Sequence, residues 1–211
     1  MKKFEILKSG KTVFFEEGVF PITTDSLFLA DFIKLKSRSK VADLGAGTGV
    51  LSFSLDEKVE SCLLIDNNEK AVELINEAIS SNNLNNYSAL LADVKSLDSS
   101  LFGSFDAVIM NPPYFKGKGF LPEKDFLKSA RHGEIEDFIV AASNLLKTKA
   151  SLFAVFPAGD LFLLSSLFNN NRLFVKRICF VKTKSGRVNT VLIEAKKDAA
   201  HGVVYEKDII V

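Results

Sequence analysis

The 211-residue sequence predicts an α/β fold: one domain with a mostly parallel sheet and helices on both faces. Three observations predict this class. Short apolar runs rich in β-branched and aromatic residues alternate with stretches of helical periodicity. A glycine-rich turn follows the first of these runs, and acidic residues stand at three successive strand ends. In open parallel sheets, ligands bind outside the carboxyl ends of the strands.

The composition is that of an ordinary globular protein, with 47% hydrophobic and 25% charged residues. A chain of this length buries roughly 70% of its unfolded surface, which is enough for one core. The net charge of +1 conceals an asymmetry, because residues 1–114 carry 11 bases and 16 acids whereas residues 115–211 carry 16 bases and 10 acids. The basic second half favours a polyanionic partner.

The cysteines and the apolar segments indicate the compartment. Cys62 and Cys179 fall inside apolar runs, which is typical of buried free thiols, and the sequence shows no metal-ligand spacing. No signal peptide is recognisable at the N-terminus. The most hydrophobic window, residues 152–168, is interrupted by Pro157, Gly159 and Asp160, which argues against a membrane span. We expect a cytoplasmic protein without a metal.

The first 39 residues are expected to precede the catalytic core as a small hairpin and one helix. Phe4–Leu7 and Thr12–Phe15 are the two candidate strands of the hairpin. A helical apolar pattern runs from Leu27 to Ile33, and either Asp25 or Ser26 can cap it. A plain N-cap and a role over a bound cofactor explain these two polar residues equally well.

The first parallel strand is predicted at Lys40–Leu44, where a glycine turn joins it to a helix. Gly45, Gly47 and Gly49 allow the backbone to approach a ligand closely, and the helix start offers free N–H groups. Their G-x-G-x-G spacing differs from the G-x-G-x-x-G fingerprint of dinucleotide sites. Asp43 is unwelcome beside a pyrophosphate, but it suits a ligand with an ammonium group, such as the methionine end of S-adenosylmethionine.

Two further acids follow the next two strands. Cys62–Ile65 is predicted as the second strand, and Asp66 at its end can accept hydrogen bonds from both hydroxyls of a ribose. A helical pattern begins at Asn67. Tyr87–Ala92 is the third strand, and the Asp93 that follows it can accept from an adenine amino group or simply cap the turn.

The fourth strand, Phe105–Met110, leads directly into Asn111-Pro112-Pro113-Tyr114. Because the two prolines restrict the backbone, the amide oxygen of Asn111 and the carbonyl of Pro112 can be held as a pair of acceptors. Tyr114 adds a flat face for stacking. Two acceptors and a ring suit a planar group that carries an NH2, such as the exocyclic amine of a nucleobase or the side-chain amide of glutamine.

The remainder of the chain predicts three more strands. Ala150–Phe156 is the fifth and is followed by a helix, and then Leu173–Val181 and Val188–Glu194 stand next to each other in sequence. The expected catalytic core therefore spans residues 40–196, and residues 197–211 form a tail without a recognisable motif.

Basic residues in the second half mark candidate contacts to a nucleic acid. The loop at residues 115–120 mixes aromatics with bases between glycines, which suits a lid over a substrate as well as an ordinary surface loop. Arg172 to Arg187 contains six bases and no acid, a pattern that fits phosphate contacts and an aggregation-resistant sheet edge equally. The predicted substrate contacts are Phe115, Lys116, Lys118, Arg131, His132, Lys182, Lys184 and Arg187.

In this order, the acids, the glycines and the N-P-P-Y motif resemble the class I S-adenosylmethionine-dependent methyltransferases that methylate amino groups. Residues 23–26, 114–115 and 130–132 further resemble the bacterial tRNA adenine-N6 methyltransferases that modify valine tRNA. The resemblance covers roughly residues 18–196. It implies a Rossmann-like sheet of seven strands with the last strand antiparallel, S-adenosyl-L-methionine as cofactor, and methylation of an adenine N6 in RNA, with tRNA expected as the substrate of a monomeric enzyme.

The resemblance also implies roles for individual residues. Catalysis is assigned to Asn111, Pro112, Pro113 and Tyr114. Cofactor binding is assigned to Thr24, Asp25, Asp43, Gly45, Gly47, Gly49, Asp66, Asn67, Asp93, Val94 and Asn111.

Two alternative functions stay open. N-P-P-Y enzymes that resemble the release-factor glutamine methyltransferases act on a protein amide, but they usually carry a helical N-terminal domain, for which the approximately 40 residues ahead of Val41 leave no room. A non-catalytic S-adenosylmethionine-binding module that binds RNA is the second alternative. The intact glycines and acids count against it.

Overall fold

The computed structural model describes residues 2–55, 59–112 and 125–211, with the backbone alone for residues 125–133. The strands are β1 (Lys3–Ile6), β2 (Thr12–Phe15), β3 (Ser39–Leu44), β4 (Val59–Asp66), β5 (Tyr87–Leu91), β6 (Phe105–Met110), β7 (Leu146–Pro157), β8 (Leu173–Lys182), β9 (Val188–Lys197), β10 (Val204–Tyr205) and β11 (Ile209–Ile210). The helices are α1 (Thr24–Phe32), α2 (Val50–Ser54), α3 (Glu69–Ser81), α4 (Asp125–Leu145) and α5 (Leu161–Asn170), with 3-10 turns η1 (Val94–Ser96), η2 (Ser99–Leu101) and η3 (Ala158–Asp160).

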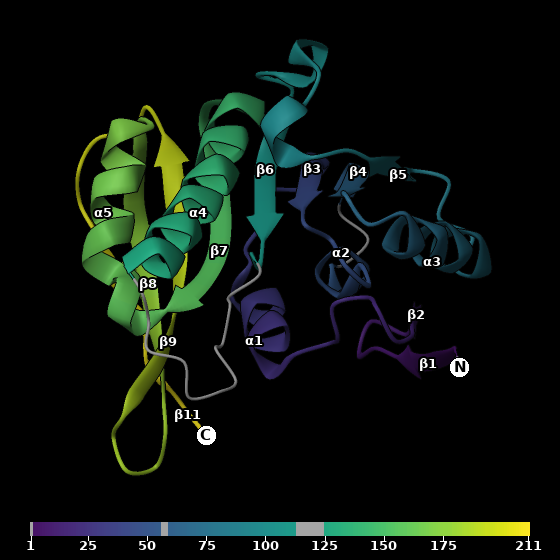
Figure 1. The fold of residues 1–211 in the computed structure, drawn as a ribbon, viewed down its shortest axis with the longest axis horizontal. Helices are drawn as coiled ribbons and strands as arrows, with labels where there is room; N and C mark the ends of the chain where they lie inside the picture. The colour runs from purple at the N-terminus through teal and green to yellow at the C-terminus, as the bar shows by residue number, and fades with distance from the viewer. Residues whose placement is uncertain (1, 56–58, 113–124) are drawn as a thin grey trace.

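The central sheet has the strand order β10-β8-β9-β7-β6-β3-β4-β5, and β11 also pairs with β8 (Figure 1). Strands β5, β4, β3, β6 and β7 are parallel neighbours. Strand β9 runs antiparallel to both β7 and β8. The predicted α/β fold with an antiparallel last strand is thereby confirmed, and the predicted hairpin is present as β1 and β2.

The tail departs from the prediction, because β10 and β11 extend the expected seven strands to nine within the described residues. Each is only two residues long and pairs in parallel with β8. A two-residue strand is too short to show the alternation of apolar and polar residues by which strands are predicted from sequence. It forms because the outer edge of β8 presents unpaired backbone groups, which the tail satisfies.

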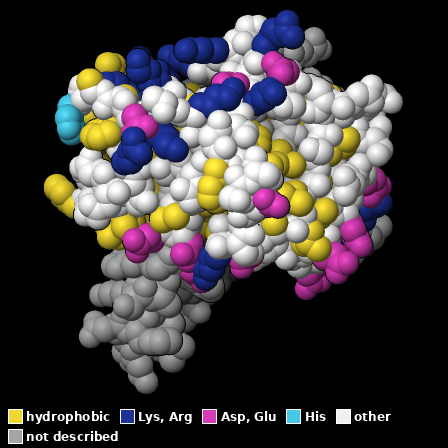
Figure 2. Space-filling model, turned by 90° about the horizontal axis from the view of Figure 1, so that it is seen from above, with side chains coloured by type: hydrophobic (Ala, Val, Ile, Leu, Met, Phe, Trp, Pro, Cys, Tyr) yellow, Lys and Arg dark blue, Asp and Glu magenta, His cyan; other side chains and the backbone are white. Residues whose placement is uncertain are grey.

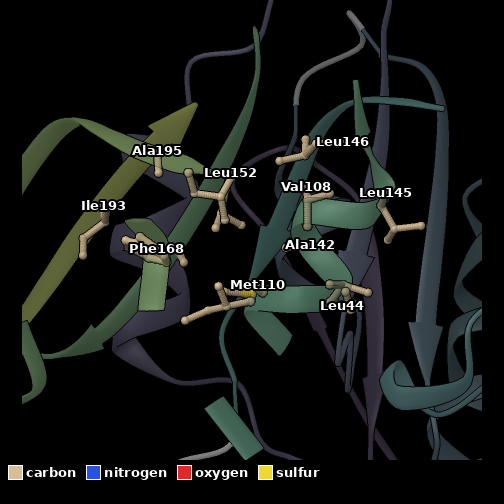
Figure 3. Packing of buried hydrophobic residues seen from close by; sticks show 14 of the residues in the cluster. Leu44, Val108, Met110, Ala142, Leu145, Leu146, Leu152, Phe168, Ile193 and Ala195 are labelled. Atoms are coloured by element: carbon tan, nitrogen blue, oxygen red, sulfur yellow. The ribbon is translucent and has the colours of Figure 1, made fainter. Parts of the chain in front are cut away.

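Apolar side chains on both faces of the sheet explain why its parallel strands are continuous hydrophobic runs. Leu44, Val108 and Met110 pack against α4 and α5, in a cluster that includes Leu145 and Phe168 (Figure 3). The alternate positions of the same strands face α1, α2 and α3 in a second cluster. Full burial of each large side chain contributes about 1.5–3 kcal/mol. The two apolar clusters therefore hold the strands, and with them the residues at the strand ends, in place.

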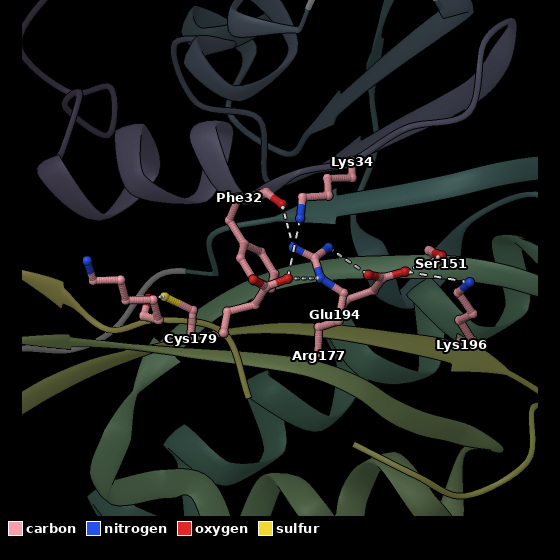
Figure 4. Close-up of polar contacts among 9 residues, drawn as sticks. Phe32, Lys34, Ser151, Arg177, Cys179, Glu194 and Lys196 are labelled. Atoms are coloured by element: carbon pink, nitrogen blue, oxygen red, sulfur yellow. Dashed lines mark hydrogen bonds and ion pairs between the residues drawn. The ribbon is translucent and has the colours of Figure 1, made fainter. Parts of the chain in front are cut away.

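A buried ion pair joins the tail to the sheet. Arg177 on β8 donates from Nη1 to Glu194 on β9 and from Nε to Glu206 in the tail, both at 2.8 Å (Figure 4). Its guanidinium lies 4.3 Å from the centre of the Phe32 ring. Although burial opposes it, hydrogen bonding to the two carboxylates raises the pKa of Arg177. The Arg177 charge is thus satisfied inside the protein and is not available to a ligand.

None of the helices in the described ranges has both the length and the apolar character needed to cross a lipid bilayer.

Candidate active site

A cavity of about 340 Å³ opens where the parallel strands β3, β4, β5 and β6 end. This volume falls within the range of small-molecule sites. Seven of the residues predicted to bind a cofactor line this catalytic cavity: Gly45, Gly47, Asp66, Asn67, Asp93, Val94 and Asn111. Because the carboxyl ends of parallel strands lie at the same edge of the sheet, residues that follow four different strands come together here.

Asp66 connects the end of β4 to the glycine turn. Its Oδ2 accepts a hydrogen bond from the backbone N–H of Gly47 at 2.8 Å, and its Oδ1 accepts from the N–H of Asn68 at 2.9 Å. These two bonds fix the orientation of a carboxylate that also lines the cavity. Because each carboxylate oxygen has two lone pairs, Asp66 retains acceptor capacity for the hydroxyls of a ligand.

Gly49 shapes the turn without lining the cavity. Its φ of +74° lies in the left-handed region, and it caps α2. A Cβ at this position would lie 2.5 Å from Phe53 Cε2 and 3.0 Å from Leu64 Cδ2, both in the core. Gly49 therefore has a packing role, because an added Cβ would meet core side chains, and its predicted cofactor contact stays a prediction.

Replacing Gly49 with alanine is expected to lower the free energy of unfolding by roughly 2–5 kcal/mol. The left-handed backbone costs about 1–2 kcal/mol for a residue with a Cβ, and overpacking of the core adds about 1–3 kcal/mol. Gly103→Ala is the matched control, because its φ is +63° but no atom lies within 4 Å of the added Cβ. Urea unfolding curves should give a lower free energy of unfolding for Gly49→Ala than for Gly103→Ala. Equal free energies of unfolding would show that the contact of the added Cβ with Phe53 does not destabilise the protein.

Asp43 lies beneath the glycine turn rather than on the cavity wall. Its side chain is almost fully buried, and Oδ2 accepts a hydrogen bond from the hydroxyl of Ser52 at 2.7 Å. Burial raises the pKa of Asp43 to about 7, although the hydrogen bonds from Ser52 oppose this shift. Asp43 is not among the described residues that line the cavity, and its predicted contact with a ligand ammonium group stays a prediction.

Asn111 presents an unpaired acceptor at the cavity. Its Nδ2 donates to the Oγ of Ser26 at 2.8 Å and lies 3.4 Å from the Oγ1 of Thr23. Its Oδ1 is buried and has no hydrogen-bond partner among the described residues. A buried acceptor without a partner costs about 1–3 kcal/mol, so a ligand that donates a hydrogen bond here is favoured.

The residues that hold Asn111 come from the start of α1 and were not identified from sequence. Thr23, and not Asp25 or Ser26, is the N-cap of α1, and its Oγ1 accepts from the N–H of Ser26 at 3.2 Å. The cap therefore lies two or three residues earlier than the expected cap at Asp25 or Ser26. Asp25 instead accepts from the hydroxyl of Thr190 at 3.2 Å. Neither Asp25 nor Thr24 belongs to the described wall of the cavity, and their predicted role in cofactor binding stays a prediction.

The cavity wall is acidic. Among the described residues, Asp66, Asp93, Glu134 and Asp137 line it against one base, Lys95, whose Nζ lies 3.3 Å from Oδ2 of Asp137. This balance favours a cationic ligand, such as a sulfonium that also carries an ammonium group. Asp93 in addition caps η1 by accepting from the N–H of Lys95, which confirms the turn cap, whereas its contact with an adenine amino group stays a prediction.

Several wall residues were missed by the sequence reasoning. Glu134, Asp137 and Phe138 come from α4, and their i, i+3, i+4 spacing places them on one helix face, which is a signal that the sequence does contain. The other residues missed are Phe20, Asn68, Ala71, Ala92 and Lys95.

Of the remaining residues predicted to act in catalysis or substrate binding, several lie outside the described part of the chain. Pro112 is buried directly after Asn111. Pro113, Tyr114, Phe115, Lys116 and Lys118 lie outside the described residues, as do the side chains of Arg131 and His132.

Three of the six bases between Arg172 and Arg187 form ion pairs with acids of the described residues, which the sequence did not anticipate. Arg172 pairs with Asp198 at 2.7 Å, and Lys182 pairs with Asp208 in the tail. Lys184 and Arg187, at the tip between β8 and β9, make no ion pair with a described residue and remain candidate substrate contacts.

Comparison with protein families decides the class of enzyme. The sequence model of the methyltransferase small domain family matches residues 7–178. The chain belongs to this family. This membership confirms the resemblance to S-adenosylmethionine-dependent methyltransferases and identifies the protein as a methyltransferase.

Relatives and solved structures agree with membership of the methyltransferase small domain family. A tRNA1(Val) (adenine(37)-N6)-methyltransferase of Tolumonas auensis is 27% identical over 183 residues, which is 82% of this chain and 74% of the relative. A predicted O-methyltransferase from Agrobacterium tumefaciens has the same fold, with a TM-score of 0.71 at 19% identity over 89% of this chain and 87% of its own.

A second solved structure is of M. jannaschii TYW2 in complex with AdoMet. It gives a TM-score of 0.63 at 17% identity, and the match covers 92% of this chain and 85% of that protein. At this level of identity the match shows that the two proteins share a fold.

Proposed function

We propose that this methyltransferase transfers a methyl group from S-adenosylmethionine to the N6 amino group of an adenine in RNA, with tRNA as the substrate class. The observation that carries the proposal is the Asn111 side chain, whose NH2 is bonded to Ser26 while its oxygen remains unpartnered at the cavity. An exocyclic amine supplies the missing donor. The name of the Tolumonas auensis relative supports adenine in tRNA as the acceptor.

The cavity residues fit the cofactor. Asp66 would accept from the ribose hydroxyls, Gly45 and Gly47 would allow close approach of the turn, and Asp93 with Val94 would contact the adenine ring. When bound, the cofactor supplies a methyl group on a sulfonium, which is an activated leaving group. The excess of acids around the cavity favours its positive charge.

The chain's own residues then orient the acceptor. The amide oxygen of Asn111 and the carbonyl of Pro112 would accept the two N6 hydrogens, which directs the nitrogen lone pair at the methyl group. Tyr114 would stack on the extruded base. After transfer, the methylated ammonium is acidic and releases its proton to water, so the reaction proceeds without a dedicated base.

Nucleoside mass spectrometry tests the proposal directly. RNA from a strain lacking the protein should have lost an N6-methyladenosine, and the purified enzyme with labelled S-adenosylmethionine should restore it in bulk tRNA. Two outcomes would contradict the proposal: label that appears in a protein glutamine instead of RNA, or no transfer at all despite cofactor binding. These correspond to the glutamine methyltransferase and to the non-catalytic RNA-binding module.

A further inference from the structure

A second cavity, of about 330 Å³, lies at the opposite end of the sheet from the catalytic cavity. Ser39 at the start of β3 lines this amino-end pocket, whereas Gly45, directly after β3, lines the catalytic cavity. At about 3.3 Å per residue, the strand separates the two cavities by roughly 20 Å. In Figure 1 the arrow of β6 points downward, so Figure 2, seen from above, views the amino-end face, where Lys and Arg side chains gather.

The amino-end pocket is strongly basic. It is lined by two acids and by six bases, which are Lys34, Lys36, Arg38, Lys147, Lys149 and Lys196. Both acids already have cationic partners, because Lys147 donates to Asp106 at 2.7 Å and Arg177 donates to Glu194 at 2.8 Å.

Three of the bases have unengaged side chains. Lys36, Arg38 and Lys149 are exposed, and their side chains form no ion pair or hydrogen bond with any residue in the described part of the chain. Each charge therefore remains available to an anion.

Two of these bases occupy backbone positions that do not favour them. Arg38 has a φ of +61° and Lys149 a φ of +64°, in the left-handed region where glycine and asparagine are preferred. Arg38 lies in the turn before β3, and Lys149 lies where the register between β6 and β7 shifts. Because this backbone conformation favours glycine or asparagine, it does not itself explain why the two positions carry basic side chains.

The catalytic cavity, by contrast, has four acids and one base on its described wall, so it repels phosphates. From these observations we infer that the amino-end pocket binds backbone phosphates of the RNA whose adenine enters the catalytic cavity. This inference rests on the proposed function. It assigns Arg38 and Lys149 to contacts with RNA phosphates far from the reacting adenine. Such contacts position the RNA but do not depend on its base sequence.

The double variant Arg38→Asn/Lys149→Asn provides the test. Asparagine suits both left-handed positions, so thermal melting should occur at the wild-type temperature or above. Fluorescence anisotropy with labelled bulk tRNA should show affinity weaker by roughly 10-fold at about 0.1 M salt, and a slope of log K against log salt that is smaller by about 2. The control variant Lys3→Asn/Lys8→Asn removes two exposed charges on the β1–β2 hairpin side and should leave the slope unchanged.

The outcomes separate this inference from the proposed reaction, because binding is measured without methyl transfer. An unchanged slope in the pocket variant, or an equal fall in the control, would overturn the inference. It would also be overturned if inorganic phosphate raised the melting temperature of the wild type but not of the pocket variant while tRNA binding was the same for both. A wild type that binds tRNA through the pocket but methylates no adenine would overturn the reaction alone.

Discussion

Replacement of Asn111 by alanine is expected to lower kcat by about 10²–10³-fold. The side chain places its unpartnered amide oxygen at the catalytic cavity, where it would polarise and orient the acceptor amine. Loss of one preorganised hydrogen bond to a reacting group typically costs this much. Single-turnover transfer from labelled S-adenosylmethionine to tRNA measures the effect, and calorimetry should show that the variant still folds.

Ser26 provides the internal control for this prediction, because it touches Asn111 and not the cavity. Alanine is a good helix former and Ser26 lies inside α1, so Ser26→Ala should fold normally. It should lower kcat by roughly 10-fold through lost orientation of the amide. Ser26→Thr retains the hydroxyl and should recover most of this loss. Turnover at the wild-type level in Asn111→Ala would remove Asn111 from the mechanism.

A second large effect is expected for Asp66→Ala, which should weaken S-adenosylmethionine binding by about 10²–10³-fold. Asp66 would accept two hydroxyl hydrogen bonds from the ribose, and hydrogen bonds to a charged group contribute about 1.5–3 kcal/mol each. The variant also releases the N–H of Gly47, which loosens the glycine turn. Isothermal titration calorimetry gives the dissociation constant directly.

Asp98→Ala is the matched control for Asp66→Ala. Asp98 also accepts from a backbone N–H, that of Ser100, but it caps the exposed turn η2 away from the catalytic cavity. Its loss should leave the dissociation constant within about 3-fold of wild type, because no ligand contact is removed. If Asp66→Ala also remained within this range, the carboxylate would not hold the ribose.

Local patterns in the sequence were sufficient for much of the fold. The apolar runs that became β3 to β9 could be recognised because strands buried on both faces are continuously hydrophobic. Asp66 and Asn111 could be located because each directly follows such a run, and the chain topology brings strand ends together. The sequence by itself therefore determined the class of fold, the end of the sheet that carries the cavity and seven of the fifteen described residues that line it.

The tertiary structure decided which of these residues line the cavity. Ser26 and Asn111 are 85 residues apart and meet only because α1 packs beside the end of β6. Asp43 is covered by the turn that follows it, and the acids of the tail neutralise bases on β8. The hydrophobic periodicity of a segment indicates which of its own side chains are buried. The contacts above depend instead on how distant segments are placed relative to one another, and long-range packing sets that placement.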